Sequence, residues 1–227
     1  ILSYSVQENY RNSLDIKYDM YNIQFSKPKD SLYAIVDSPY LTGTLILPET
    51  ITGDNRLTAR LKYFDLNKFQ GIADPAGYPY LDMDIKRVKI NNYYFDDFKL
   101  KTSPLENGML IDQLDFSNNN LTMAGNGKWL NGDDGQITLF DANFTSSNFG
   151  KALDILGYKN LIKRGMMSSQ LIGQWKGSPD YFSLNNFDGK INIDLKKGEF
   201  LQVSNQSRAI GQLLGIFRIS SLQNRLY

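Results

Sequence analysis

Pairs of aspartates are the only side chains in this chain whose type and spacing could support catalysis. None of the 227 residues is His or Cys. This excludes imidazole and thiolate metal sites, Cys/His dyads and the Ser-His-Asp triad. The candidate pairs are Asp82/Asp84, Asp96/Asp97, Asp133/Asp134 and Asp188/Asp194.

The pair Asp82/Asp84 shows why these carboxylates favour a solvated surface. On a strand, both side chains share one face, opposite the apolar residues between and beside them. They would then lie in water, away from any apolar pocket that could raise a carboxyl pKa. We therefore expect no enzymatic activity from these pairs.

Two glycine-containing segments suggest ligand sites but lack the required spacing. Residues 131–135 (Asn-Gly-Asp-Asp-Gly) lack the twelve-residue ligand pattern and terminal Glu of an EF-hand, so they favour a hairpin turn. The run from Gly211 to Gly215 does not follow the spacing that cradles phosphate. We expect neither a metal nor a cofactor.

The composition is that of a globular chain with balanced charge. It is 41% hydrophobic and 22% charged, with a net charge of +1, so no global field favours nucleic acid. No run of apolar residues approaches membrane-spanning length, and the N-terminal residues lack a charged signal region. We expect a soluble piece of a longer protein.

Apolar and polar residues alternate with a period of two through most of the chain. Apolar residues alternate with Asp, Lys, Asn or Thr, which predicts strands with one wet face. Short turn segments separate these strands, at 91–92, 106–108, 118–120, 131–135 and 196–198. The predicted fold is therefore mainly β: a strongly twisted antiparallel meander sheet forming an open groove, in one segment over 1–227.

Two segments change to helical spacing. Ser146, Ser147 and Asn148 supply an N-cap and Gly157 a C-cap, predicting a short helix over 147–157. A second amphipathic helix is expected over 207–222. Its apolar stripe, either a cap on the sheet or a membrane contact, comprises Ile210, Leu213, Leu214 and Phe217.

The apolar face of the sheet is the remaining candidate site, and two interpretations of it stay open. It can be a closed core under the helices, or an open trough in which each buried methylene of an acyl chain gains about 0.8 kcal/mol. The candidate groove residues are Leu81, Met83, Ile85, Leu121, Met123, Ile191, Ile193 and Leu195.

A pattern near the C-terminus resembles a known family. Trp175, then Gly-Ser-Pro at 177–179 and Phe-Ser-Leu at 182–184, precede a glycine-bounded strand at 189–198 and a Gly/Leu-rich run that closes on Arg225 and Leu226. This order resembles the C-terminal region of the YhdP-type, AsmA-like envelope proteins. Looser likenesses, such as Gly127-Lys-Trp129 and Pro79 to Ile85, extend the resemblance over most of residues 40 to 226.

The resemblance implies a role in the cell envelope. Such proteins are anchored in the inner membrane and cross the periplasm as a long β-groove implicated in phospholipid movement. It implies a periplasmic segment, whose anchor is not in this chain, with phospholipid acyl chains as partners and possible contacts with membrane surfaces or envelope proteins. The rival interpretation is a structural envelope module with a filled core.

Overall fold

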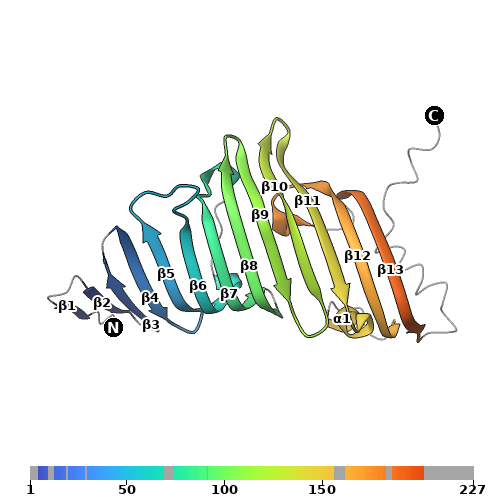
Figure 1. Cartoon of the computed structure of the whole chain (residues 1–227), viewed down its shortest axis with the longest axis horizontal. Coiled ribbons are helices and arrows are strands. Elements are labelled where there is room, and N and C mark those ends of the chain that lie inside the picture. Colours follow the sequence, from blue (N-terminus) through green and yellow to red (C-terminus); the bar gives the residue numbers. More distant parts are fainter. Residues whose placement is uncertain are drawn as a thin grey trace.

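The computed structural model describes residues 5–9, 13–18, 20–28, 30–68, 74–90, 92–155, 162–182 and 186–201, and they form one long sheet. Figure 1 shows its strands side by side, with β1 at one end of the row and β13 at the other. The strands are β1 (Ser5–Asn9), β2 (Ser13–Tyr18), β3 (Tyr21–Ser26), β4 (Ser31–Asp37), β5 (Leu41–Pro48), β6 (Leu57–Asp65), β7 (Leu81–Ile90), β8 (Tyr93–Leu105), β9 (Gly108–Ser117), β10 (Thr122–Gly132), β11 (Gly135–Ser146), β12 (Ile162–Lys176) and β13 (Phe187–Phe200).

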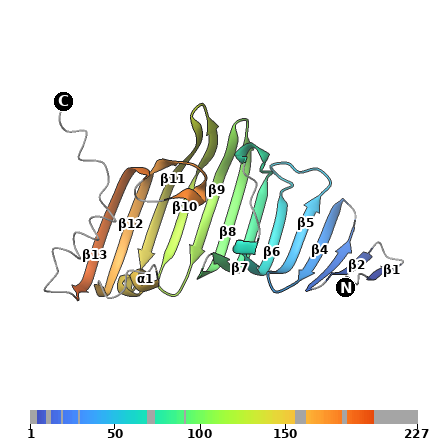
Figure 2. The same ribbon diagram turned by 180° about the vertical axis from the view of Figure 1, so that it is seen from behind.

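The order of the 13 strands in the sheet is their order in the chain. The sheet stays open, with β1 and β13 as its two edges, and the views from opposite sides in Figures 1 and 2 show a single layer of strands. This confirms the predicted mainly β, open meander. The reason is local: period-two alternation favours strands, and short turns favour pairing with the next strand.

The hairpins fall where turn residues cluster. Residues 106–107 join β8 to β9, and the loop between Gly132 and Gly135 joins β10 to β11. Between β9 and β10, the Asn118 side chain accepts hydrogen bonds from the backbone of Asn120 and Leu121, both at 2.9 Å. The Asn-Gly-Asp-Asp-Gly segment is therefore a hairpin turn, as its sequence predicts.

The prediction that all neighbouring strands pair in antiparallel fashion was wrong at one place. β6 and β7 pair in parallel, with Leu57 opposite Leu81 and Leu61 opposite Ile85. Two parallel neighbours require a crossover connection, which here includes the short 3-10 turns η1 (Leu66–Lys68) and η2 (Pro75–Gly77). All other neighbouring strands pair in antiparallel fashion.

The turn predicted at 196–198 was also wrong. Strand β13 continues through these residues and pairs with β12, with Arg164 opposite Gly198 and Met166 opposite Lys196. The glycine and lysines instead mark a local distortion, since Lys197 has φ 59° and Arg164 has φ 63°. Turn-forming residues can serve a kink inside a strand when the partner strand continues beyond it.

One helix lies among the described residues. α1 (Phe149–Ile155) falls inside the expected range 147–157, and the Asn148 side chain accepts a hydrogen bond from the Lys151 backbone at 3.2 Å. Figure 1 places α1 at the lower edge of the sheet, beside β11 and β12. Gly157 and the expected helix over 207–222, with Ile210, Leu213, Leu214 and Phe217, lie outside the described residues.

Candidate functional site

Apolar residues, with Gly125 among them, follow one another across one face of the sheet from β3 to β13; we call this the apolar face. Cross-strand partners share a face, so the register traces it directly. One row of partners runs through Phe25, Ala34, Leu45, Ala59, Met83, Leu100, Leu114, Gly125, Ala142, Leu171 and Ile191. The described strands form a single sheet, so no second sheet covers this row.

The opposite face, here the polar face, carries charged residues that pair across strands. The Arg60 guanidinium lies 2.8 Å from the Asp82 carboxylate, and Arg87 lies 2.8 Å from Asp96. Exposed pairs of this kind contribute about 0–1 kcal/mol each. Their main effect is therefore to keep this face in water and the other face inward.

A buried carboxylate, that of Asp65, lies at the end of β6. Asp65, whose side chain is 5% exposed, lies 3.3 Å from Lys89 and accepts hydrogen bonds from the backbone and side chain of Asn67. Burial acts to raise the pKa of Asp65, but the hydrogen bonds from Lys89 and Asn67 outweigh it and hold the pKa below its usual value. The ionised carboxylate thus fixes the start of the crossover at η1.

The structure puts the predicted groove residues on the apolar face, with unequal exposure. Leu81, Ile85 and Met123 are buried, and Ile85 is 0% exposed. Met83, Leu121, Ile191 and Leu195 are half-buried, while Ile193 is 37% exposed. The face is therefore closely packed around β6 to β8 and most accessible on β13.

A short segment before β7, residues 74–80, lies over the apolar face; we call it the strap. Its Tyr78 ring stacks at a tilt on Trp129 of β10, with ring centroids 5.5 Å apart. The Asp74 carboxylate accepts hydrogen bonds from Asn131 at 2.7 Å and from the Ala76 backbone at 3.0 Å, which lower its pKa. The strap thereby covers Trp129 and its neighbours Met109 and Ile111.

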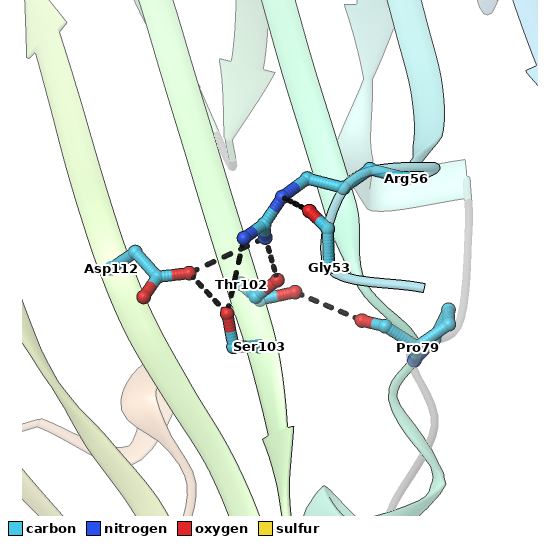
Figure 3. A network of polar contacts seen from close by, with 6 residues as sticks. All are labelled: Gly53, Arg56, Pro79, Thr102, Ser103 and Asp112. Carbon is cyan, nitrogen blue, oxygen red and sulfur yellow. Dashed lines mark hydrogen bonds and ion pairs between the residues drawn. The ribbon is translucent and has the colours of Figure 1, made fainter. Parts of the chain in front are cut away.

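The strap is fastened to the sheet by Arg56, which precedes β6 (Figure 3). Its guanidinium donates to the Thr102 carbonyl and to the Ser103 hydroxyl on β8, and forms an ion pair with Asp112 on β9. The same group lies over the Tyr80 ring at 5.2 Å, and the buried Thr102 hydroxyl donates to the Pro79 carbonyl at 3.1 Å. Arg56 therefore joins the strap to both β8 and β9.

A second covering segment follows β12. The turn η3 (Pro179–Tyr181) leads into Phe182, whose ring packs edge-on against Trp175 at 5.1 Å and against Phe187 at 5.8 Å. The Trp175 indole donates to the Ser178 carbonyl at 2.9 Å. This aromatic group covers the apolar face where β12 ends.

The two tryptophans flank one strand, β11. Thr138 of β11 is opposite both Trp129 and Trp175, is fully buried, and donates to the Gly177 carbonyl at 2.8 Å. Trp129 and Trp175 thus occupy neighbouring places in one row of the apolar face. Both covering segments lie at the same rim of the sheet.

The helix α1 covers the other rim. Its buried residues Phe149, Ala152 and Leu153 pack with Ile162 and Met167 of β12. The predicted groove residues Leu121 and Leu195 and the half-buried Phe144 contact this cluster. The accessible part of the apolar face therefore lies between α1 on one rim and the aromatic groups on the other.

The aspartate pairs do not form a shared site. Asp82 pairs with Arg60, Asp96 with Arg87, Asp97 with Lys86, and Asp194 with Lys196. Asp82 and Asp84 lie on the polar face, opposite Lys101 and Lys99. Within the described ranges, no group of three or more carboxylates could hold a metal ion.

Sequence reasoning missed the residues that cover the apolar face: Arg56, Tyr78, Thr138 and Phe182. Phe182 belongs to the motif after Trp175, so an aromatic residue beside a buried tryptophan was an available signal. Arg56 and Tyr78 carried no such signal, because Thr102 lies 46 positions after Arg56 and Trp129, the partner of Tyr78, lies on the distant strand β10.

The comparison with protein families decides the classification. The family model described as YhdP protein matches residues 7–227, which is nearly the whole chain. The chain belongs to the YhdP family. Searches of the curated proteins and of the solved structures find no match.

The YhdP family is an AsmA-like family of envelope proteins. The AsmA-like proteins are linked to lipid transport. The family is a non-enzymatic transport family. Among the residues that the structure describes, no helix is long and apolar enough to cross a bilayer.

Proposed function

We propose that this chain is a non-enzymatic segment of a periplasmic phospholipid conduit, in which the apolar face shields acyl chains between the inner and outer membranes. The observation that carries the proposal is the row of apolar residues, with Gly125 among them, across β3 to β13 in the single sheet that the described strands form. Such a face extends in the direction in which strands are added. It therefore supplies a path along the molecule and not a closed pocket.

The energetics favour an apolar chain as the occupant. Each methylene removed from water gains about 0.8 kcal/mol, so a stretch of only a few methylenes offsets the cost of ordering a flexible tail. The polar face, with ion pairs such as Arg60–Asp82, stays hydrated. A sheet with these two faces can keep lipid tails dry in an aqueous compartment.

The exposure of Ile193 indicates where an acyl chain has access. Ile193 is 37% exposed and lies on the apolar face of β13, next to the half-buried Ile191 and Leu195. These residues are bounded by α1 at one rim and by the Phe182–Trp175 aromatic group at the other. We assign the accessible part of the path to β13, because the apolar-face residues Met167, Leu171 and Trp175 of β12 are buried.

The alternative is a structural envelope module with a filled core. It is supported by one observation: Ile85 and Val88 are 0% and 1% exposed, so the cluster over β4 to β8 is closed by protein side chains alone. In that case the apolar face serves stability and the edges of the sheet contact neighbouring proteins.

Site-specific photo-crosslinking separates the two functions. A photoreactive residue at Ile193 is expected to capture phospholipid from the cell envelope, because its side chain lies on the accessible part of the apolar face. The matched control is the adjacent Asn192, which is exposed on the polar face of the same strand. The adduct is identified by mass spectrometry.

The conduit requires several-fold more lipid adduct at Ile193 than at Asn192. Equal capture at both positions would indicate adsorption of lipid to the surface and reject the conduit. Absence of adduct at both, with protein crosslinks at the sheet edges, would favour the structural module.

A further inference from the structure

A basic pocket lies beside α1, outside the apolar face. Lys151, Lys163 and Arg164 line a pocket of about 300 Å³ together with Asn148, Gly150, Asp154, Ile162 and Leu201. The three cationic side chains are exposed, and none of them forms an ion pair with another residue that the structure describes. Asp154 is the single carboxylate of the lining, so the pocket keeps a net positive charge.

A close approach between helix and strand builds this pocket. A Cβ at Gly150 would lie 2.2 Å from the Ile162 carbonyl oxygen and 3.1 Å from the Arg164 nitrogen, so only glycine allows this packing. Lys151 follows directly and is fixed in the first turn by the Asn148 side chain. Lys151 is thereby held beside the start of β12, where Lys163 and Arg164 lie.

The backbone at this place is unusual. Arg164 on β12 has φ 63°, and Lys197 on the facing strand β13 has φ 59°, a region that glycine favours. Both residues are exposed and basic. Strained backbone at non-glycine residues clusters at binding sites, where the side chain is needed in that position.

The pocket lies where a charged rim meets the apolar face. Ile162 lines the pocket and also belongs to the buried cluster that α1 forms with Met167. Half-buried Leu195 of β13 contacts the same cluster. A ligand with a phosphate at one end and an apolar body at the other would find partners for both parts within a short distance.

We propose that the pocket of Lys151, Lys163 and Arg164 binds the phosphate group of an anionic phospholipid at the rim of the apolar face. Lysine and arginine are the usual partners of phosphate oxygens, through charge-assisted hydrogen bonds. This inference rests on the proposed function for the position of the lipid tail. The binding of the phosphate itself depends only on the basic pocket.

The test measures binding of the full chain to lipid vesicles of two compositions. Vesicles of phosphatidylcholine alone serve as the reference, and an admixture of phosphatidylglycerol supplies the anionic phosphate. Inorganic phosphate is titrated separately, with binding followed by NMR chemical shifts. The wild type is expected to bind the anionic vesicles more tightly, with an affinity that falls as salt concentration rises.

The test variant combines Lys163→Gln with Arg164→Gly. Glycine suits the backbone of residue 164, so the fold should be retained while two positive charges are lost. Affinity for anionic vesicles is expected to fall roughly thirtyfold, because each basic residue near an anionic surface contributes about a fivefold factor. The matched control is Lys176→Gln with Lys190→Gln, two exposed lysines on β12 and on the neighbouring β13, outside the pocket.

Four outcomes decide the matter. A selective loss in the test variant, with the control unchanged, supports the proposal. Equal binding by test variant and wild type overturns it, as does binding of inorganic phosphate without preference for anionic vesicles. A selective loss combined with no lipid capture at Ile193 upholds the pocket and rejects the conduit.

Discussion

At the scale of single residues, the left-handed backbone of Arg164 destabilises the folded state. For an L residue, the left-handed conformation at φ 63° costs about 1–2 kcal/mol. Arg164→Gly is expected to leave the free energy of unfolding unchanged or raise it by up to about 1 kcal/mol, since relief of strain exceeds the entropy gained by the unfolded chain. Urea unfolding measures this change.

Lys163 provides the comparison for that substitution. It is the preceding residue of the same strand and has no left-handed φ. Lys163→Gly is therefore expected to destabilise by about 0.5–1 kcal/mol. If Arg164→Gly were as costly as Lys163→Gly, the strain at residue 164 would be refuted.

Asp65 predicts how stability depends on acid. Its pKa in the folded state lies below the value of about 3.9 in an unfolded chain. The folded state then binds the proton less readily, so the stabilisation is present above about pH 4 and is lost as the pH falls through the folded pKa. Asp65→Asn should remove this contribution.

The measurement is the melting temperature of wild type and Asp65→Asn between about pH 5 and pH 2. The wild type is expected to lose stability more steeply as the pH falls, because only it carries the carboxylate that Lys89 and Asn67 stabilise. Identical slopes for the two proteins would contradict the role given to Asp65.

At the scale of elements, the seat of α1 depends on one glycine. A Cβ at Gly150 would overlap the Ile162 carbonyl oxygen, so Gly150→Ala must push the helix away from β12. The displaced helix uncovers Phe149 and Leu153, and we expect a loss of about 1–3 kcal/mol in the free energy of unfolding. Thermal melting gives the value.

Lys151→Ala is the control for this change. Lys151 is the next residue of the same helix and is exposed, so alanine there should alter stability by less than about 0.5 kcal/mol. A Gly150→Ala protein as stable as Lys151→Ala would show that α1 does not require close contact with the strand.

The elements also show how far sequence reasoning reaches. Alternation predicted strands such as β7 and β13, because a one-sided sheet imprints its period on each strand. The crossover between β6 and β7 could not be predicted, since contacts between distant positions, such as Asp74–Asn131 and Pro79–Thr102, hold it. The residues around Lys197 have the composition of a turn, and only the pairing of Gly198 with Arg164 shows that the strand continues.

The apolar face was predictable as a surface but not in its exposure. Leu81, Met83 and Ile85 occupy the expected face, yet the difference between the buried Ile85 and the exposed Ile193 depends on what covers each. Covering groups such as Tyr78 and Phe182 come from connections that have no period. Hence sequence patterns locate the face and leave its open part undetermined.

At the scale of the whole molecule, each strand contacts mainly its neighbours in the chain. Stability is then a sum of local pairings, as in repeat proteins, and the edges open before the centre. Amide hydrogen exchange should be slowest on β7 to β11, where the strap and Arg56 add contacts, and faster on β3 and β4. Uniform protection across all these strands would indicate a single cooperative unit.

The matching order of strands in chain and sheet has a consequence for biosynthesis. A polypeptide emerges from its N-terminus, and each new antiparallel strand here finds its partner already made, one hairpin earlier. Assembly can therefore keep pace with emergence, without waiting for the distant end of the chain. The stepwise addition of strands is delayed at the parallel pair of β6 and β7, because β7 can pair with β6 only after the whole crossover has emerged.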